Sequence, residues 1–127
     1  MQAFPDMAWM EGFRDRVNAD PEMAVIGDWF STSFSLGFGA TRYVVSVEQG
    51  KVAEIKPAPR VDSRARFGFR APMAVWNLFV SPNPPPLYHD FFAMLMRVPE
   101  FVLEGDGLVA MQNARALHRM MNLMRGG

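Results

Sequence analysis

The sequence predicts an α+β fold in which a five-stranded, mainly antiparallel sheet is covered on one face by helices. Apolar and polar residues alternate through most of residues 30–71, as they do in strands that have one buried face. The segments on either side carry apolar residues at the spacing of amphipathic helices. A chain of 127 residues is long enough for one core of this kind, so we expect residues 1–127 to form a single domain.

Two helices are expected before the sheet. Asp6 is a good cap for a helix that runs to about Asn18, with an apolar stripe of Met7, Met10, Phe13 and Val17. The tripeptide Asp20-Pro21-Glu22 then supplies a cap, a first-turn proline and an acidic residue near the helix dipole. It therefore predicts the start of a second, short helix.

The strands are expected to form an antiparallel meander. The alternating stretches are residues 30–38, 43–48, 52–56 and 64–71. Gly39-Ala40 and Gln49-Gly50 lie between the first three stretches and fit tight hairpin turns. One face of the sheet is then aromatic and aliphatic, and the other is rich in Ser and Arg.

The second half of the chain is expected to be mostly helical. Its predicted elements are a helix from Pro72 to Val80, a stiff proline loop over 81–86, a helix over 87–97, a strand over 99–103 and a last, longest helix from Gly107 to about Arg125. The last helix has an apolar stripe of Ala110, Ala114, Leu117, Met121 and Met124.

The composition excludes several classes of protein. The chain has 13 basic and 13 acidic residues, and a nucleic-acid-binding surface needs a positive excess. It has no cysteine, which removes disulfides, thiolate nucleophiles and cysteine-based metal sites. No apolar run approaches the roughly 18 residues of a membrane span, and the first residues lack the features of a signal peptide. We expect a cytoplasmic protein without a transmembrane segment, a metal or a cofactor.

The polar candidates for chemistry are few. His89 and Asp90 suggest a base and its orienting carboxylate, but neighbours on a helix point about 100° apart. We therefore favour positions near solvent for both, and a surface position for His118. Arg60, Arg64, Arg66 and Arg70 are interpreted as the solvated face of a strand, with a docking patch for anionic lipid headgroups or an acidic partner as the alternative.

The surplus of large soft side chains is the strongest clue, since the chain has 11 Met and 11 Phe residues. Methionine adapts to variable apolar shapes and specifies a core poorly. In the second half it is concentrated on the helices, at Met94, Met96, Met111, Met120, Met121 and Met124. Helices of this kind over an aromatic sheet face predict an apolar cavity, although a filled core fits the composition as well.

The order of several segments resembles the sterol carrier protein type 2 (SCP-2) superfamily, from about Asp20 to Arg125. The resemblance rests on a strand pair led by Trp29, the turn Val47–Val52, the charged strand Asp62–Arg70, the helix segment Trp76-Asn77-Leu78, and Phe101–Asp106 before the last helix. It implies a five-stranded sheet and helices that enclose a tunnel for sterols, fatty acids or acyl-CoA, without catalysis or metal. The proline loop departs from the family pattern near the expected cavity mouth. The lack of a peroxisomal signal fits a bacterial or stand-alone version.

The leading hypothesis is non-catalytic binding or transfer of a lipid-like ligand in an apolar cavity. The expected lining is Phe67, Phe69, Trp76, Phe79, Phe91, Phe92, Leu95, Leu117, Met121 and Met124. One alternative is an enzyme that uses the same cavity, with His89 or Asp90 as its acid or base. Another is an interaction module with a filled core, whose Met-rich face docks a partner or a second copy as a homodimer.

Overall fold

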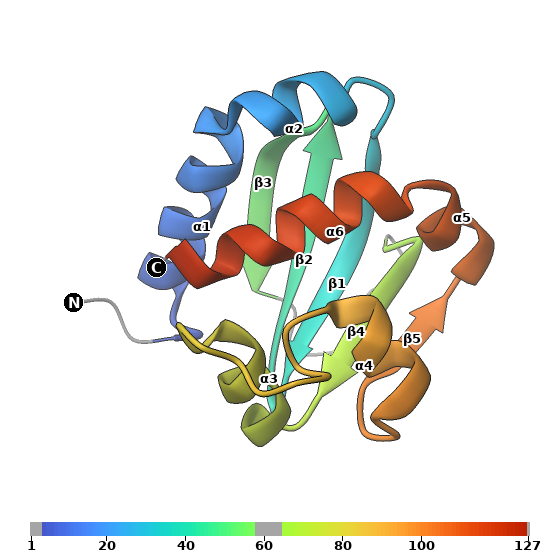
Figure 1. The fold of residues 1–127 in the computed structure, drawn as a ribbon. Coiled ribbons are helices and arrows are strands. Elements are labelled where there is room, and N and C mark those ends of the chain that lie inside the picture. Colours follow the sequence, from blue (N-terminus) through green and yellow to red (C-terminus); the bar gives the residue numbers. More distant parts are fainter. Residues whose placement is uncertain (1–3, 58–64, 127) are drawn as a thin grey trace.

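The computed structural model describes residues 4–57 and 65–126. All of its helices lie on one face of the five-stranded sheet, and α6 crosses in front of the central strands (Figure 1). The helices are α1 (Met7–Ala19), α2 (Pro21–Ile26), α3 (Met73–Val80), α4 (Phe91–Arg97), α5 (Gly107–Gln112) and α6 (Ala114–Asn122), followed by the 3-10 helix η1 (Leu123–Gly126). The strands are β1 (Thr32–Phe38), β2 (Thr41–Glu48), β3 (Lys51–Pro57), β4 (Phe67–Ala71) and β5 (Val102–Gly105). The predicted α+β class is confirmed.

The first helices and hairpins form where the local signals place them. The Asp20 carboxylate accepts a hydrogen bond of 2.9 Å from the Met23 amide and so caps α2. Asp6 precedes α1, but its side chain makes no capping hydrogen bond. Gln49 and Gly50 have φ values of 50° and 79°, which suit the tight turn between β2 and β3.

The fourth strand differs from the predicted meander. β4 pairs in parallel with β1, and the sheet order is β3-β2-β1-β4-β5. Phe34 on β1 lies beside Phe67 on β4, and their rings stack with centroids 5.4 Å apart. Alternation in a sequence identifies the buried face of a strand, but it does not identify the neighbouring strand. The other strand pairs are antiparallel, so the sheet is mainly antiparallel as predicted.

The predicted last helix is two helices that meet at Asn113. This residue has φ −111° and ψ 23°, ends α5 and precedes α6. Its side-chain amide donates a hydrogen bond of 2.9 Å to the carbonyl oxygen of Val109. Asparagine competes in this way with the regular backbone pattern of a helix, and the apolar period alone does not reveal the break.

Two further elements are shorter or shifted relative to the prediction. α4 begins at Phe91 and not near Leu87, because the Leu87 backbone has φ 85° and Asp90 caps the helix through the Phe92 amide at 2.9 Å. The last strand covers Val102–Gly105 where the sequence predicts 99–103. Phe101 just before it is buried, as expected for an inward residue.

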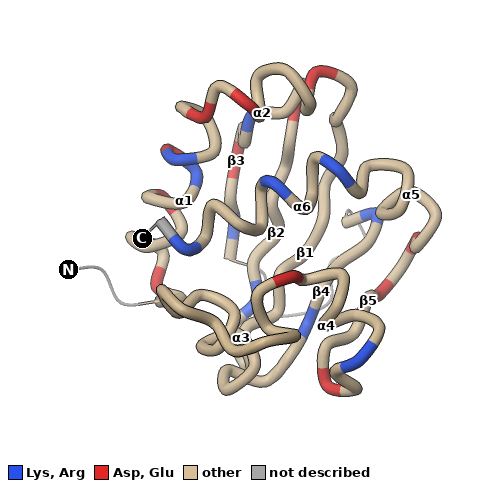
Figure 2. The backbone as a smooth tube through the Cα atoms, in the orientation of Figure 1, with Lys and Arg blue, Asp and Glu red and all other residues tan. Residues whose placement is uncertain are grey.

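Charged residues of both signs are interspersed along the chain (Figure 2). Within the predicted arginine row, Arg70 lies 3.2 Å from Glu104 and Arg66 lies 3.6 Å from Asp106. These side chains are half-exposed and paired with acids, which fits the solvated strand face. Arg60 and Arg64 lie outside the described residues. In the ranges 4–57 and 65–126, no helix has the length and apolar character needed to cross a membrane.

Candidate functional site

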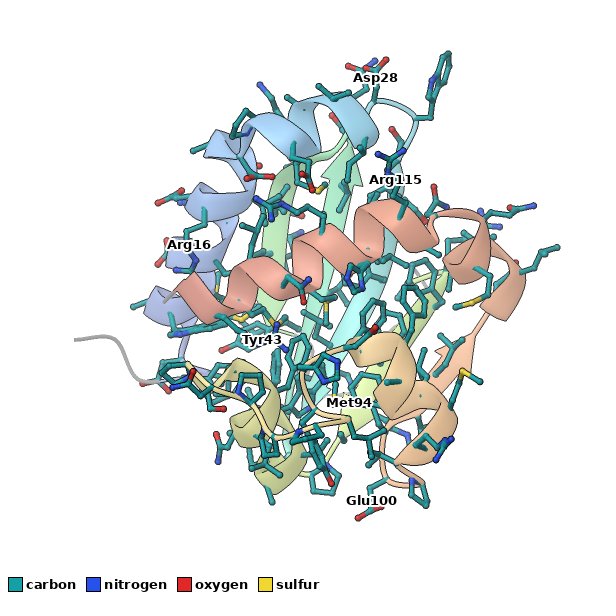
Figure 3. The ribbon with its side chains drawn as sticks, viewed as in Figure 1. Arg16, Asp28, Tyr43, Met94, Glu100 and Arg115 are labelled. Atoms are coloured by element: carbon teal, nitrogen blue, oxygen red, sulfur yellow. The ribbon has the colours of Figure 1, made fainter. Side chains whose placement is uncertain are left out.

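The predicted lining residues come together between the sheet and its helices, and we refer to them collectively as the apolar layer. They come from β4 (Phe67, Phe69), α3 (Trp76, Phe79), α4 (Phe91, Phe92, Leu95), α6 (Leu117, Met121) and η1 (Met124). Phe92 and Leu95 are partly buried at its edge, and the others are buried. Side chains of the helices and of the sheet face one another across this space (Figure 3).

The rings of the apolar layer contact one another directly. Phe69 lies at its centre, with ring centroids 5.2 Å from Phe91 and 6.0 Å from Phe101. The Trp76 ring lies 5.3 Å from Phe101 and 6.1 Å from Phe79. A ligand that enters this layer must therefore displace some of these contacts.

Further buried residues of the same core were not among the predicted lining residues. Among them are Met94 on α4, Met120 on α6 and Phe101 just before β5. The sequence signals for them were present, since Phe101 is an aromatic residue within the predicted strand 99–103 and both methionines belong to the surplus. Met96 and Met111, in contrast, are exposed and do not contribute to the layer.

Few polar groups reach the apolar layer. The buried indole of Trp76 donates a hydrogen bond of 2.8 Å to the carbonyl oxygen of Gly37. Among the residues that the structure describes, every buried side-chain nitrogen or oxygen has a hydrogen-bond partner. The layer therefore offers apolar contacts, and polar groups are available at its margins.

One margin, the polar edge, consists of Asp90, His118, Asn122 and Arg125. Arg125 donates hydrogen bonds to the carbonyl oxygens of Phe79 at 2.6 Å and of His89 at 2.8 Å, and its guanidinium lies 4.4 Å from the centre of the Phe79 ring. Burial lowers the pKa of Arg125, and the nearby Asp90 charge opposes that shift. The end of the chain thus holds the segment before α4 against α3.

The structure pairs Asp90 with His118 rather than with its neighbour His89. The His118 Nδ1 atom lies 3.7 Å from the Asp90 carboxylate, and the imidazole stacks on the Phe92 ring at 6.0 Å. On its other side, His118 Nε2 lies 3.3 Å from the Asn122 amide nitrogen. His118 is therefore half-exposed at the polar edge instead of standing free on the surface. No cluster of His, Cys, Asp and Glu suited to a metal ion occurs within 4–57 and 65–126.

The comparisons with known proteins give structural neighbours only. No family model matches the sequence, and no curated protein matches it. A crystal structure of sterol carrier protein 2 superposes with a TM-score of 0.79 at 16% identity, over 97% of this chain and 98% of that one.

Two further solved structures extend this comparison. One is the solution structure of a conserved hypothetical protein of Thermus thermophilus, described as possibly a sterol carrier protein. It has a TM-score of 0.76 and 18% identity over 99% of this chain and 90% of that one. The other, a UbiJ-SCP2 ubiquinone synthesis protein, has a TM-score of 0.56 and 10% identity over 90% of each chain.

These neighbours define the class of the molecule as an α+β domain with a helix-covered mixed sheet. More particularly, the chain has an SCP-2-like fold, as the resemblance of its sequence segments implied.

Proposed function

We propose that this protein binds and transfers a hydrophobic, lipid-like ligand, such as a sterol, a fatty acid or an acyl-CoA, without catalysing a reaction on it. The ligand lies in the apolar layer, with its apolar part between β4 and α6. The observation that carries the proposal is that one continuous apolar layer brings together all of the predicted lining residues. The SCP-2 fold of the structural neighbours supports it.

The methionines of the layer give it the ability to adapt. Met121 on α6 and Met124 on η1 are buried in the same core cluster as the aromatic residues of the sheet and of α3. An unbranched thioether can change rotamer at small cost and fill an irregular gap. Binding then gains about 25 cal/mol for each Å² of apolar ligand surface removed from water. This gain offsets the displaced ring contacts.

The direct test is to look for a lipid in the protein as purified. Native mass spectrometry is expected to show a bound species that disappears after delipidation. The delipidated protein should then unfold at a higher temperature when a sterol, a long-chain fatty acid or an acyl-CoA is added, because ligand binding to the native state stabilises it. No bound species and no thermal shift with any of the three classes would refute the proposal.

A pair of variants tests where the ligand lies. Leu95 is partly buried at the edge of the layer, whereas Leu78 on α3 is exposed to solvent. Leu95→Gln is expected to weaken ligand binding by about tenfold, since it removes apolar contact worth more than 1 kcal/mol. Leu78→Gln should leave the affinity unchanged. Equal affinities for both variants would mean that the ligand lies elsewhere.

The Asp90–His118 pair favours a second candidate, an enzyme that acts on an apolar substrate in the same layer. The Asp90 carboxylate lies 3.7 Å from the imidazole, beyond hydrogen-bond distance, and a small approach of the two groups would let it orient His118 as a general base. For this function, His118→Gln would abolish turnover of a bound ester while leaving ligand affinity intact. If the protein is a carrier, neither the unsubstituted protein nor His118→Gln turns over the bound ester. His89 keeps only a backbone interaction with Arg125 in the described contacts.

A further inference from the structure

Large apolar side chains are exposed at the end of the molecule where α2 leads into β1 and α5 meets α6. Trp29 is 92% exposed, Leu108 is 68% exposed and Met111 is 44% exposed. The other two tryptophans, Trp9 and Trp76, are buried. An exposed tryptophan among aliphatic side chains is typical of a surface that meets an apolar or amphipathic partner.

Of these three residues, Trp29 lines a pocket of about 120 Å³. Its lining comprises Ile26, Trp29, Phe30, Gln112, Asn113, Arg115 and Ala116. Leu108 precedes Gln112 by four residues on α5, so it lies on the same side of that helix as the pocket. The break at Asn113 turns the chain here, and the pocket lies against that turn. We call Trp29, Leu108, Met111 and this pocket the Trp29 rim.

The floor of the pocket belongs to the core. Phe30 and Ala116 line the pocket and are also almost fully buried. The Phe30 ring stacks on Phe34 at 6.5 Å, and Phe34 stacks on Phe67 at 5.4 Å. A row of aromatic rings thus connects the pocket to the apolar layer.

The charges around the rim suit lipid headgroups. α5 contains no charged residue, and Arg115 at the start of α6 is exposed. Within the described parts of the chain, no hydrogen bond or ion pair occupies the Arg115 guanidinium. Figure 3 shows Arg115 below the turn that follows α2 and Asp28 directed away from the molecule above it. An unpaired guanidinium beside apolar side chains is complementary to a phosphate group at a bilayer surface.

We propose that the Trp29 rim docks on the surface of a lipid bilayer, with Trp29 and Leu108 inserted at the headgroup level and the pocket as the entry for a lipid. This proposal rests on the proposed function, since a carrier must collect its ligand from a membrane. The rim exposes three large side chains, fewer than the roughly 20–30 residues a side of a stable protein interface. A bilayer surface needs no matching partner, because tryptophan and aliphatic side chains partition into it individually.

The test uses vesicles of phosphatidylcholine, alone and with phosphatidylglycerol, that contain brominated acyl chains. Bromine quenches only nearby indoles, and Trp9 and Trp76 are buried, so quenching reports on Trp29. We expect quenching with both vesicle types. Leu108→Ser should weaken vesicle binding by about tenfold, and Arg115→Gln by roughly fivefold. Met96→Ser is the matched control, because Met96 is 84% exposed but lies on α4, and its vesicle affinity should not change.

Three results would overturn docking. The first is that vesicles do not quench the fluorescence of the unsubstituted protein. The second is that Met96→Ser loses as much vesicle affinity as Leu108→Ser. The third is that the protein does not bind vesicles but self-associates in sedimentation, and that Leu108→Ser abolishes this self-association. The last result would make the rim an interface between two copies. Binding of a fluorescent fatty acid in free solution separates this proposal from the proposed function. If solution binding persists while vesicle binding is absent, only docking fails. If the fatty acid, a sterol and an acyl-CoA all fail to bind in solution, the proposed function fails.

Discussion

The guanidinium of Arg125 donates a hydrogen bond of 2.8 Å to the backbone carbonyl of His89, although 36 residues separate the two in the chain. The same side chain also donates to the carbonyl oxygens of Tyr88 at 3.2 Å and of Phe79 at 2.6 Å. Arg125 therefore fastens the segment between α3 and α4 to the end of the chain. This segment closes one margin of the apolar layer.

Replacing this guanidinium should destabilise the protein. Arg125→Lys keeps the positive charge but cannot reach several carbonyl oxygens at once, so we expect a loss of about 1–3 kcal/mol in the free energy of unfolding. Urea unfolding measures the loss. Arg97→Lys is the control, because Arg97 is exposed at the end of α4 and its stability should change by less than about 0.5 kcal/mol. Similar values for the two variants would contradict the fastening role.

The contact of α6 with α2 should make the free energy of unfolding depend on pH in the acidic range. Asp20 accepts hydrogen bonds from Arg119 at 2.7 and 3.0 Å, and this interaction holds the pKa of Asp20 below its usual value of about 4. Because the folded pKa is depressed, the stabilisation is complete above the unfolded pKa and is lost as the pH falls through the folded pKa. Asp20→Asn should therefore be less stable than the unsubstituted protein at pH 7.

Urea titrations from pH 7 down to about pH 2 test this expectation. The difference in unfolding free energy between the Asp20→Asn variant and the unsubstituted protein should shrink below about pH 4. Asp15→Asn is the control, because Asp15 is an exposed residue that pairs only with its neighbour Arg14. A difference for Asp20→Asn that stays constant over this pH range would rule out the proposed linkage.

The buried indole hydrogen bond predicts a specific cost. Trp76→Phe removes the donor to the Gly37 carbonyl and leaves that buried oxygen without its partner. We expect a loss of about 1–3 kcal/mol from the hydrogen bond alone, measured by urea unfolding. Trp9→Phe makes a comparable change in ring size at a buried indole, for which the structure shows ring and cation contacts instead. The loss for Trp9→Phe should be the smaller of the two.

Gly50 is expected to tolerate no side chain. Its φ of 79° favours glycine, and an added Cβ would lie 2.8 Å from the Cα of Gly27. Gly50→Ala should therefore lower the melting temperature, with a cost of about 1–3 kcal/mol. Gly107→Ala provides the contrast, because its nearest neighbour would be a Leu103 methyl group at 3.5 Å and it begins α5. That variant should be as stable as the original or up to about 1 kcal/mol more stable. An unchanged melting temperature for Gly50→Ala would disprove the close approach of Gly50 to Gly27.

Local patterns in the sequence predict most of the secondary structure. The alternation around Phe34 and the cap at Asp20 depend on residues a few positions apart, so they can be read from the chain. The burial of Phe69, Trp76 and Leu117 follows from the same periodicities. That the ten expected lining residues lie in one core could be predicted as a group, because apolar faces must be buried together.

Features that join distant residues could not be predicted in this way. The parallel partner of β4 and the Asp90–His118 pair are set by how the elements pack. The break at Asn113 is decided by one side-chain hydrogen bond within a sequence of regular helical period. The exposure of Trp29 is likewise set by packing, and no local pattern in the sequence predicts it.

The parallel pairing of β1 with β4 has a consequence for the order of folding. β1, β2 and β3 are joined by short turns, so their hairpins close rapidly as local units. The β1–β4 pair closes a much longer loop of chain, so the chain loses more conformational entropy before the contacts of this pair form. Phe67 and Phe69 lie on β4, and we expect them to enter the core with that second event. Substitutions in β4 are therefore expected to change the folding rate, because they alter the step in which β4 pairs with β1.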